Sequence, residues 1–241
     1  MQLKDKRALV TGASGGIGQA IVATLKDHGA IVTGTDMTPV EADFSIEGDL
    51  TNGGFCDQLP LQASNAMGGL DIVVNNAGII TRGDITQATD DDYRRTMAVN
   101  VEAPFRLCRA AVPLMANTGG GAIVNTASCW GVHPGPRHPI YVMSKAAIAS
   151  LTQCLGMDHA HQNIRVNAVC PNEVNTPMIR TGFQMRGLDP DAAIDELNAS
   201  VPLGRIAEPQ DIADVVLFLA SDQARYICGA LIEVNGGKSV Q

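Results

Sequence analysis

The segment that decides the fold lies near the N-terminus and reads Ala8-Leu9-Val10-Thr11-Gly12-Ala13-Ser14-Gly15-Gly16-Ile17-Gly18. An apolar, strand-forming run leads directly into a glycine-rich turn, and residues 16 to 29 then follow the spacing of a helix. Glycines let the backbone approach a ligand closely, and the free amides and dipole of the next helix favour a phosphate group. The segment therefore predicts a strand, a phosphate-binding loop and a helix, although a purely structural turn would also contain glycines.

The same alternation continues along the chain. Further apolar runs at residues 30 to 34, 70 to 75, 121 to 125, 164 to 169 and 231 to 234 predict strands, and helices are expected after Asn52 and over residues 90 to 116 and 139 to 161. Nearly continuous apolar runs are typical of parallel strands that helices cover on both faces. The sequence predicts an α/β fold: one Rossmann-type, doubly wound parallel sheet of about seven strands with helices on both faces.

This sheet is expected to form a single domain over residues 1–241, because the chain contains no linker, low-complexity tract or internal repeat. The stretch from about 172 to 208 is unusual, since Pro and Gly divide it into short helical pieces. Insertions after the carboxyl end of a strand often close over a ligand. We expect a substrate lid here, with an ordinary peripheral helical hairpin as the alternative.

Composition excludes several classes of partner. The formal net charge of −8, without any basic run, argues against nucleic acid. The chain has neither the apolar core of a signal peptide nor about 18 consecutive apolar residues, so we expect a cytoplasmic protein with no membrane partner. The six cysteines form no C-x-x-C pair, so neither a disulfide nor a metal site is expected. Cys129 remains a minor candidate for a nucleophile.

Asp36 ends the second predicted strand, about twenty residues after the glycines. A carboxylate there accepts hydrogen bonds from the adenosine ribose hydroxyls of a dinucleotide, whereas it would repel a 2′-phosphate. No Arg or Lys stands beside it in the sequence to compensate. Asp36 therefore predicts NAD as the cofactor and disfavours NADP, although Asp also caps ordinary turns at strand ends.

Tyr141 and Lys145 stand four residues apart in a predicted helix, so their side chains share one face. Lowering a tyrosine pKa from about 10 to about 7 requires roughly 4 kcal/mol of preferential phenolate stabilisation, which a neighbouring ammonium and a cationic nicotinamide can supply. The phenolate could then accept the proton of a substrate alcohol while its carbon gives up hydride. Alone, such a pair can also be a core residue beside a snorkelling lysine.

Ser128 follows the strand at residues 121 to 125, at the sheet edge where α/β proteins bind ligands. Its hydroxyl could hold the substrate oxygen, although serines at strand ends are often turn or cap residues. With the glycine loop T-G-x-x-x-G-x-G and Y-x-x-x-K thirteen residues later, this serine makes the chain resemble the classical short-chain dehydrogenase/reductase family. The resemblance runs from about Lys6 to Gly237.

The resemblance implies a set of site residues. Asn100 matches the asparagine that kinks a helix and supports a proton-relaying water, which makes Asn100, Ser128, Tyr141 and Lys145 the catalytic tetrad; a helical Asn could instead bond locally to the backbone. Pro104 independently predicts some distortion of that helix. The cofactor-binding set is Gly12, Ser14, Gly15, Gly16, Ile17, Gly18, Asp36, Asp49, Leu50, Asn76, Ala77, Gly78, Tyr141, Lys145, Pro171, Val174 and Thr176.

One departure from the family is the loop after the strand at residues 164 to 169, where Asn172 replaces the usual glycine. We expect Asn172 or Glu173 to offer hydrogen bonds beside the nicotinamide, and the alternative is an altered turn without such a role. The substrate-contacting candidates, all at strand or loop ends, are Arg82, Ser128, His133, His138, Asn172 and Glu173, with Trp130, Met178 and Phe183 as walls. Loop Arg and His residues are, however, often only solvated surface groups.

These residues predict a small polar substrate, so the expected activity is NAD-dependent oxidation of a secondary alcohol such as a sugar, sugar acid or polyol. Two alternatives stay open. One is a 3-oxoacyl-thioester reductase, which Asp36 disfavours, and the other is a non-catalytic NAD-binding regulator, which an intact Ser, Tyr and Lys set disfavours. The resemblance also implies a homotetramer paired through the helices at residues 90 to 116 and 139 to 161.

Overall fold

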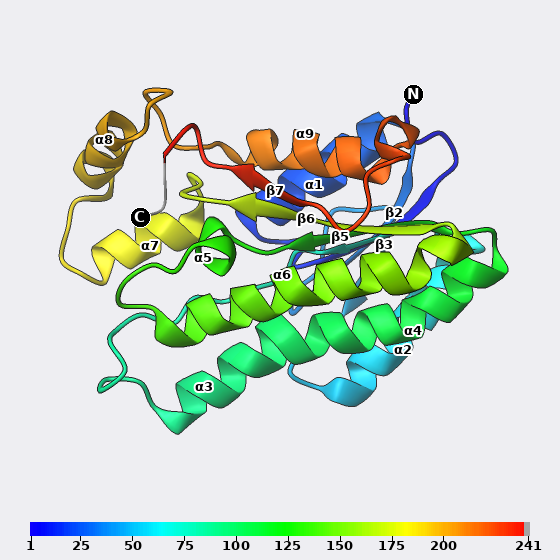
Figure 1. The fold of residues 1–241 in the computed structure, drawn as a ribbon, viewed down its shortest axis with the longest axis horizontal. Helices are drawn as coiled ribbons and strands as arrows, with labels where there is room; N and C mark the ends of the chain where they lie inside the picture. Colours follow the sequence, from blue (N-terminus) through cyan, green and yellow to red (C-terminus); the bar gives the residue numbers. More distant parts are fainter. Residues whose placement is uncertain (239–241) are drawn as a thin grey trace.

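The computed structural model describes residues 1–238, and its ribbon is drawn in Figure 1. The strands are β1 (Arg7–Thr11), β2 (Ile31–Asp36), β3 (Phe44–Glu47), β4 (Ile72–Asn75), β5 (Gly121–Thr126), β6 (Ile164–Pro171) and β7 (Leu231–Val234). The helices are α1 (Gly16–Asp27), α2 (Gly53–Met67), α3 (Asp90–Met97), α4 (Ala103–Asn117), α5 (Cys129–Val132), α6 (Pro139–His159), α7 (Pro177–Gln184), α8 (Pro190–Ser200) and α9 (Pro209–Ala220). A π-helical turn, η1 (Ala98–Glu102), joins α3 to α4, and two 3₁₀ turns are η2 (Ala160–Gln162) and η3 (Asp222–Ala224).

Within residues 1–238 the seven strands form one parallel sheet in the order β3-β2-β1-β4-β5-β6-β7. The order reverses between β1 and β4, which places the carboxyl ends of these two strands at the topological switch point. The predicted doubly wound fold is therefore confirmed. Open α/β sheets bind ligands at this point, because the diverging connections leave a crevice there.

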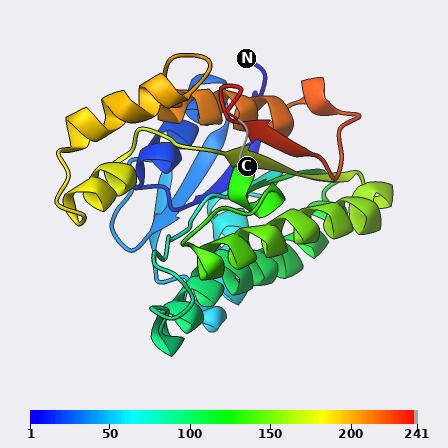
Figure 2. The same ribbon diagram turned by 60° about the vertical axis from the view of Figure 1, so that its left-hand side comes forward.

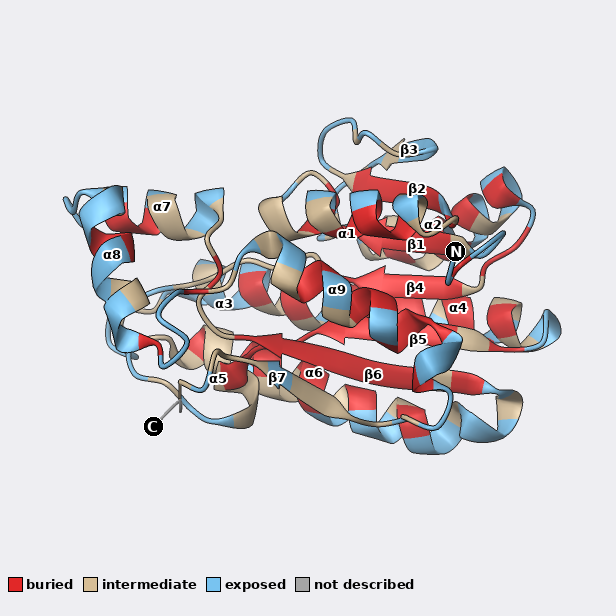
Figure 3. Ribbon diagram, turned by 90° about the horizontal axis from the view of Figure 1, so that it is seen from above, coloured by how far each residue is buried: buried red, intermediate tan, exposed pale blue. Residues whose placement is uncertain are grey.

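Helices cover both faces of the sheet, with α1 and α9 on one face and α2, α4 and α6 on the other (Figures 1 and 2). Figure 3 shows the central strands as buried between these layers. Each face has its own apolar core: one includes Val10, Ile21 and Val216, and the other includes Leu9, Leu107 and Ile123. Val10 and Leu9 are successive residues of β1 that point to opposite faces, as strand geometry requires.

Two features differ from the sequence-based expectation. Strand β3 had not been located, because Phe44–Glu47 is a short edge strand in which no residue is fully buried, so it lacks the apolar run of the central strands. The expected continuous helix over residues 90 to 116 is divided by η1 into α3 and α4. Asn100 lies inside the π-helical turn, and Pro104 follows in the first turn of α4, where its missing N–H is tolerated.

The stretch after β6 contains two short helices, α7 and α8, which project beyond the carboxyl ends of the strands (Figures 1 and 3). They have a small apolar core of their own, built from Phe183, Ala193, Ile194, Val201 and Ile206. Phe183 thus lies in the core between these helices rather than on a pocket wall. Among residues 1–238, no helix has the length and apolar character needed to cross a membrane.

Candidate active site

The glycine loop after β1 is held against the end of β4 by close backbone contacts. Gly12 has a φ of +63°, and a Cβ added to it would stand 2.7 Å from the Ala77 Cα. A Cβ on Gly18 would overlap the Gly12 carbonyl oxygen. The Asn76 side chain donates to the carbonyls of Thr11 at 3.1 Å and Gly12 at 3.2 Å. Gly12 needs glycine because of its positive φ and the close approach of Ala77, and Gly18 needs it because the first turn of α1 packs directly on the loop.

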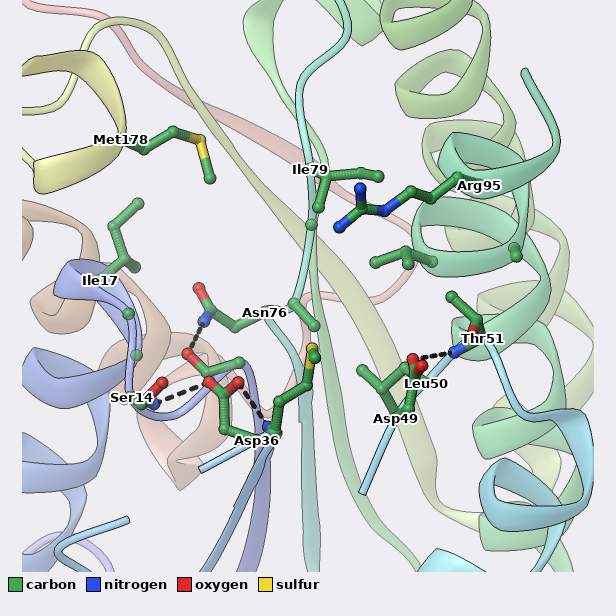
Figure 4. A pocket seen from close by; sticks show the side chains of 18 of the residues that line it. Ser14, Ile17, Asp36, Asp49, Leu50, Thr51, Asn76, Ile79, Arg95 and Met178 are labelled. Atoms are coloured by element: carbon green, nitrogen blue, oxygen red, sulfur yellow. Dashed lines mark hydrogen bonds between the residues drawn. The ribbon is translucent and has the colours of Figure 1, made fainter. Parts of the chain in front are cut away.

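Between this loop and α3 lies a groove of about 950 Å³, seen from close by in Figure 4. Most of the residues that the sequence assigned to the cofactor line it: Gly12, Ser14, Gly15, Gly16, Ile17, Gly18, Asp36, Asp49, Leu50, Asn76, Ala77, Gly78 and Thr176. The groove runs from Asp36 and Asp49 at one end to Thr176 and Met178 on the lid. A long cleft with a bare glycine floor beside a helix N-terminus fits a dinucleotide.

Asp36 ends β2 at the rim of this groove. Its carboxylate accepts hydrogen bonds from the backbone N–H of Ser14 at 3.0 Å and of Met37 at 2.8 Å (Figure 4). The fold also brings Arg94 and Arg95 of α3 into the groove lining, although no sequence pattern pointed to either residue. Arg94 forms ion pairs with Asp90 and Asp91, whereas Arg95 points into the groove from the side opposite Met178.

The catalytic candidates meet beside this groove. A Cβ at Gly78, which lines the groove, would stand 3.2 Å from Lys145 Nζ and 3.5 Å from Asn100 Oδ1. Lys145 Nζ donates to the Thr126 carbonyl at 2.7 Å and lies 5.9 Å from the centre of the Tyr141 ring. Ser128 is buried at the start of α5, where its hydroxyl accepts from the Trp130 N–H at 3.1 Å and donates to the Pro171 carbonyl at 3.4 Å.

Burial dominates the ionisation of the two central groups. It lowers the pKa of Lys145 to about 8 and raises the pKa of Tyr141, although the Ser128 hydroxyl and the positive charge of Arg82 act to lower the latter. The Lys145 ammonium was expected to lower the pKa of Tyr141, but the net effect of the protein groups is to raise it. Instead, Lys145 can gain and lose a proton close to pH 8.

Asn100 acts as a clamp, because its side chain joins the loop after β4 to helix α6, which carries Tyr141 and Lys145. Its amide accepts from the Ile79 N–H at 2.9 Å, donates to the Ile79 carbonyl at 2.9 Å and donates to Ser144 Oγ at 3.0 Å. Ser144 Oγ in turn donates to the Tyr141 carbonyl at 2.7 Å. The asparagine therefore bonds to the loop after β4 and to the catalytic helix rather than to its own helix backbone, and Ser144 is a positioning residue that sequence reasoning missed.

Two further cofactor candidates, Pro171 and Val174, do not line this groove. Pro171 accepts from Ser128, and Val174 is buried, pairs with Ala207 in an isolated bridge and accepts from the Thr176 hydroxyl at 3.4 Å. Their backbone thus supports Ser128 and Thr176.

The substrate candidates separate into two groups. His138 lies against Trp130, with ring centres 4.7 Å apart, and Trp130 meets Tyr141 edge-on at 6.3 Å. Arg82 is close enough to Tyr141 to affect its ionisation. His133, in contrast, reaches Glu233 of β7 at 3.2 Å.

Asn172 and Glu173 also turn elsewhere. Both line a second cavity of about 110 Å³ with Arg205, Asp211 and the turn after β7, and Glu173 pairs with Lys238 at 2.7 Å. The placement of Asn172 therefore does not support the expectation that it adds a polar group beside the nicotinamide. Strand β6 continues to Pro171, and the Asn172 N–H donates to the Val234 carbonyl at 3.1 Å, which holds the end of the strand against β7.

Cys129 does not have the properties of a nucleophile. Its thiol is buried and donates to the Cys170 carbonyl at 3.0 Å, and burial raises its pKa to about 12. A thiol that stays protonated at neutral pH is not activated for attack.

Comparisons with known proteins agree with this geometry. The family model described as "Enoyl-(Acyl carrier protein) reductase" matches residues 12–239. A 3alpha-hydroxysteroid dehydrogenase of Mediterraneibacter gnavus is 36% identical, with 98% of each chain covered, and a 4-formylbenzenesulfonate dehydrogenase of Comamonas testosteroni is also 36% identical, with 100% of each covered. The solved structure of an aldohexose dehydrogenase of Thermoplasma acidophilum in ligand-free form superposes with a TM-score of 0.94 at 34% identity, covering 99% of this chain and 96% of that one.

Proposed function

Because this chain belongs to the classical short-chain dehydrogenase/reductase family and is an oxidoreductase, we propose that it interconverts a secondary alcohol and its carbonyl compound with NAD as the cofactor. The proposal rests on one observation. Tyr141, Ser128 and Lys145 converge at the end of the groove, beside Gly78, which lines the groove together with the glycine loop. A proton-transferring tyrosine thus stands where the reacting end of a bound dinucleotide would lie.

The residues of the chain divide the proton chemistry between them. Bound NAD supplies the hydride acceptor, or its reduced form the donor. The Ser128 hydroxyl orients the substrate oxygen, and Tyr141 takes the alcohol proton during oxidation and returns it during reduction. Lys145 adds positive charge beside the phenolate when it is protonated, and its pKa of about 8 lets it exchange protons in the pH range of alcohol oxidation.

The preference for NAD rests on Asp36. The carboxylate occupies the rim of the groove at the carboxyl end of β2, where it can accept hydrogen bonds from the ribose hydroxyls and repel a 2′-phosphate. Arg94 forms ion pairs with Asp90 and Asp91, whereas Arg95 has no carboxylate partner among residues 1–238 and points into the groove, so the Asp36 carboxylate alone supports the proposed preference.

For the substrate, we propose a small sugar, sugar acid or polyol. The entrance beside Tyr141 carries Arg82 and His138 rather than an uninterrupted apolar wall, which suits a hydroxyl-rich compound. The name of the Thermoplasma structure specifies an aldohexose, which supports this class. A 3-oxoacyl-thioester reductase stays the second candidate, favoured by the description of the matching family model.

The test is turnover followed by nicotinamide absorbance. Aldohexoses, sugar acids, polyols, simple secondary alcohols and a 3-oxoacyl thioester would each be assayed with NAD and with NADP. NAD-linked oxidation of a polyhydroxylated compound, lost in Tyr141→Phe, is the expected result. Activity confined to the thioester with NADPH would favour the second candidate, and binding of NAD without any turnover would favour a non-catalytic regulator.

Family resemblance further leads us to propose a homotetramer. Its interface would use α4 and α6, where Phe105, Met143 and Met157 expose 46%, 50% and 74% of their surface. Light scattering on the eluting protein gives the mass directly, and a monomeric mass at micromolar concentration would contradict this assembly.

A further inference from the structure

Two arginines, Arg82 and Arg186, lie at the entrance to the candidate site. Arg180 pairs with Asp191, Arg205 with Asp211 and Arg109 with Asp57, each at a distance of 2.8 Å or less. Among residues 1–238, Arg82 and Arg186 pair with no carboxylate. Arg95, Arg137, Arg165 and Arg225 also lack a carboxylate partner among these residues, so Arg82 and Arg186 are distinguished by their position and not by being unpaired.

The two guanidinium groups meet at one glycine of the lid. Arg82 comes from the loop after β4, and its guanidinium occupies the space that a Cβ on Gly182 would fill. Arg186 comes from the turn after α7, and its Nε donates to the Gly182 carbonyl at 3.0 Å. The Arg186 guanidinium is also packed over the Phe183 ring, 4.9 Å from its centre. Segments about a hundred residues apart thus bring two positive charges together.

Their position relates them to the reacting centre. Arg82 influences the ionisation of Tyr141, and both arginines lower the pKa of His138, whose ring lies against Trp130 beside Tyr141; burial is the larger cause of that shift. Arg137 also lowers the pKa of His138, and it lowers the pKa of Asp84 as well, after the hydrogen bonds from Thr86. Arg82 and Arg186 therefore keep an unneutralised positive potential at the mouth of the site.

We propose that Arg82 and Arg186 form a subsite for an anionic group, a carboxylate or sulfonate, on the far end of the substrate. This rests on the proposed dehydrogenase function and narrows its substrate class to small hydroxy compounds that carry a negative charge. Guanidinium groups bind planar carboxylates and tetrahedral oxyanions through two parallel N–H donors. Since one arginine belongs to the lid, binding of the anion also draws α7 toward the loop after β4.

Gly182 is a positioning residue in this arrangement. A methyl group there would displace the Arg82 guanidinium without changing the net charge, while alanine suits the helical backbone better than glycine does. Gly182→Ala thus separates loss of the subsite from loss of folding, because its melting temperature should not fall.

The experiment uses a matched pair of substrates, an aldohexose and the hexuronate that differs from it only in carrying a terminal carboxylate. The readout is the ratio of kcat/KM for the charged over the neutral member. For Arg82→Gln or Arg186→Gln we expect this ratio to fall about tenfold, and for the double variant about a hundredfold. Arg82→Lys keeps the charge but not the paired donors and should recover only part of the loss.

Arg225→Gln is the charge-matched control, because Arg225 lies on an exposed turn after α9. The subsite is supported if the ratio falls in Arg82→Gln, Arg186→Gln and Gly182→Ala but not in this control, and if added salt raises the KM of the charged substrate alone. Equal ratios in all variants, or a wild-type preference for the neutral member, would overturn it.

Direct titration keeps the subsite testable if no alcohol is turned over. Calorimetry of the chain with the hexuronate, in the presence of NAD, measures binding without chemistry. If both arginine variants weaken the binding, the result supports the subsite even where the dehydrogenase proposal fails. Absence of any binding heat with the wild-type chain would contradict the subsite itself.

Discussion

Replacing Asn100 with alanine tests whether this residue is the clamp of the site. The substitution removes three buried or half-buried hydrogen bonds, two to the Ile79 backbone and one to Ser144, all between 2.9 and 3.0 Å. At about 1 kcal/mol net for each, the free energy of unfolding should fall by about 3 kcal/mol. For a domain of this size, that corresponds to a melting temperature lower by roughly 6 to 12 °C.

Activity should fall as well, because Ser144 connects the clamp to the Tyr141 backbone. At a temperature where the variant is folded, we expect kcat/KM to be lower by roughly tenfold or more, since small displacements of a catalytic group are costly. Asn100→Asp keeps an acceptor for the Ile79 N–H but loses both donated bonds, so it should behave similarly.

The assay is urea denaturation followed by circular dichroism at a fixed protein concentration. Asn175→Ala is the matched control, because its amide also makes two side-chain bonds, to Glu208 and Arg180, but near the surface, where water replaces them. A loss below about 1 kcal/mol for Asn100→Ala, or an equal loss in the control, would refute the clamp.

Three further outcomes are expected. The folded-state pKa of Lys145, about 8, lies below its ordinary 10.5, so its charge opposes folding below pH 8 and this penalty fades as the pH rises to about 10.5. The stability advantage of Lys145→Met over the wild-type chain should shrink by roughly 3 kcal/mol across that interval, and a flat difference in urea titrations would contradict the burial argument. Gly18→Ala should unfold the glycine loop, because the added methyl group overlaps the Gly12 carbonyl. In the control Gly15→Ala the nearest contact of the methyl group is at 3.4 Å, so this variant should keep the melting temperature and weaken only NAD binding. Equal melting curves for the two variants would contradict this packing. Asp36→Asn removes the charge that repels a 2′-phosphate, so the ratio of kcat/KM for NADP over NAD should rise about tenfold, and an unchanged ratio would leave the cofactor preference to other groups.

Local patterns explain why the fold and much of the site were predictable. The strand, glycine turn and helix over Ala8–Asp27 are contiguous, and the helical spacing of Tyr141 and Lys145 fixes their common face whatever surrounds them. The apolar strands predicted a parallel sheet with helices on both faces, because strands buried on both faces have no polar alternation.

Where contacts between distant segments decide the outcome, the sequence was a weaker guide. His133 was expected to contact substrate, but the approach of β7 gives it Glu233 as a partner. The Lys145 ammonium was expected to lower the pKa of Tyr141, but it bonds to Thr126, and enclosure by the surrounding side chains raises that pKa. Neither partner stands near these residues in the chain.

The amino-acid order by itself determined the doubly wound sheet, the glycine loop, Asp36 at a strand end and the tyrosine–lysine face, because each depends on periodicity or on neighbours within one turn or one strand. Only the tertiary structure decided the π-helical turn around Asn100, the direction of Asn172 and the meeting of Arg82 with Arg186 at Gly182. These depend on which distant groups share a dry or charged environment, and packing and electrostatic energies follow distance in space rather than distance along the chain.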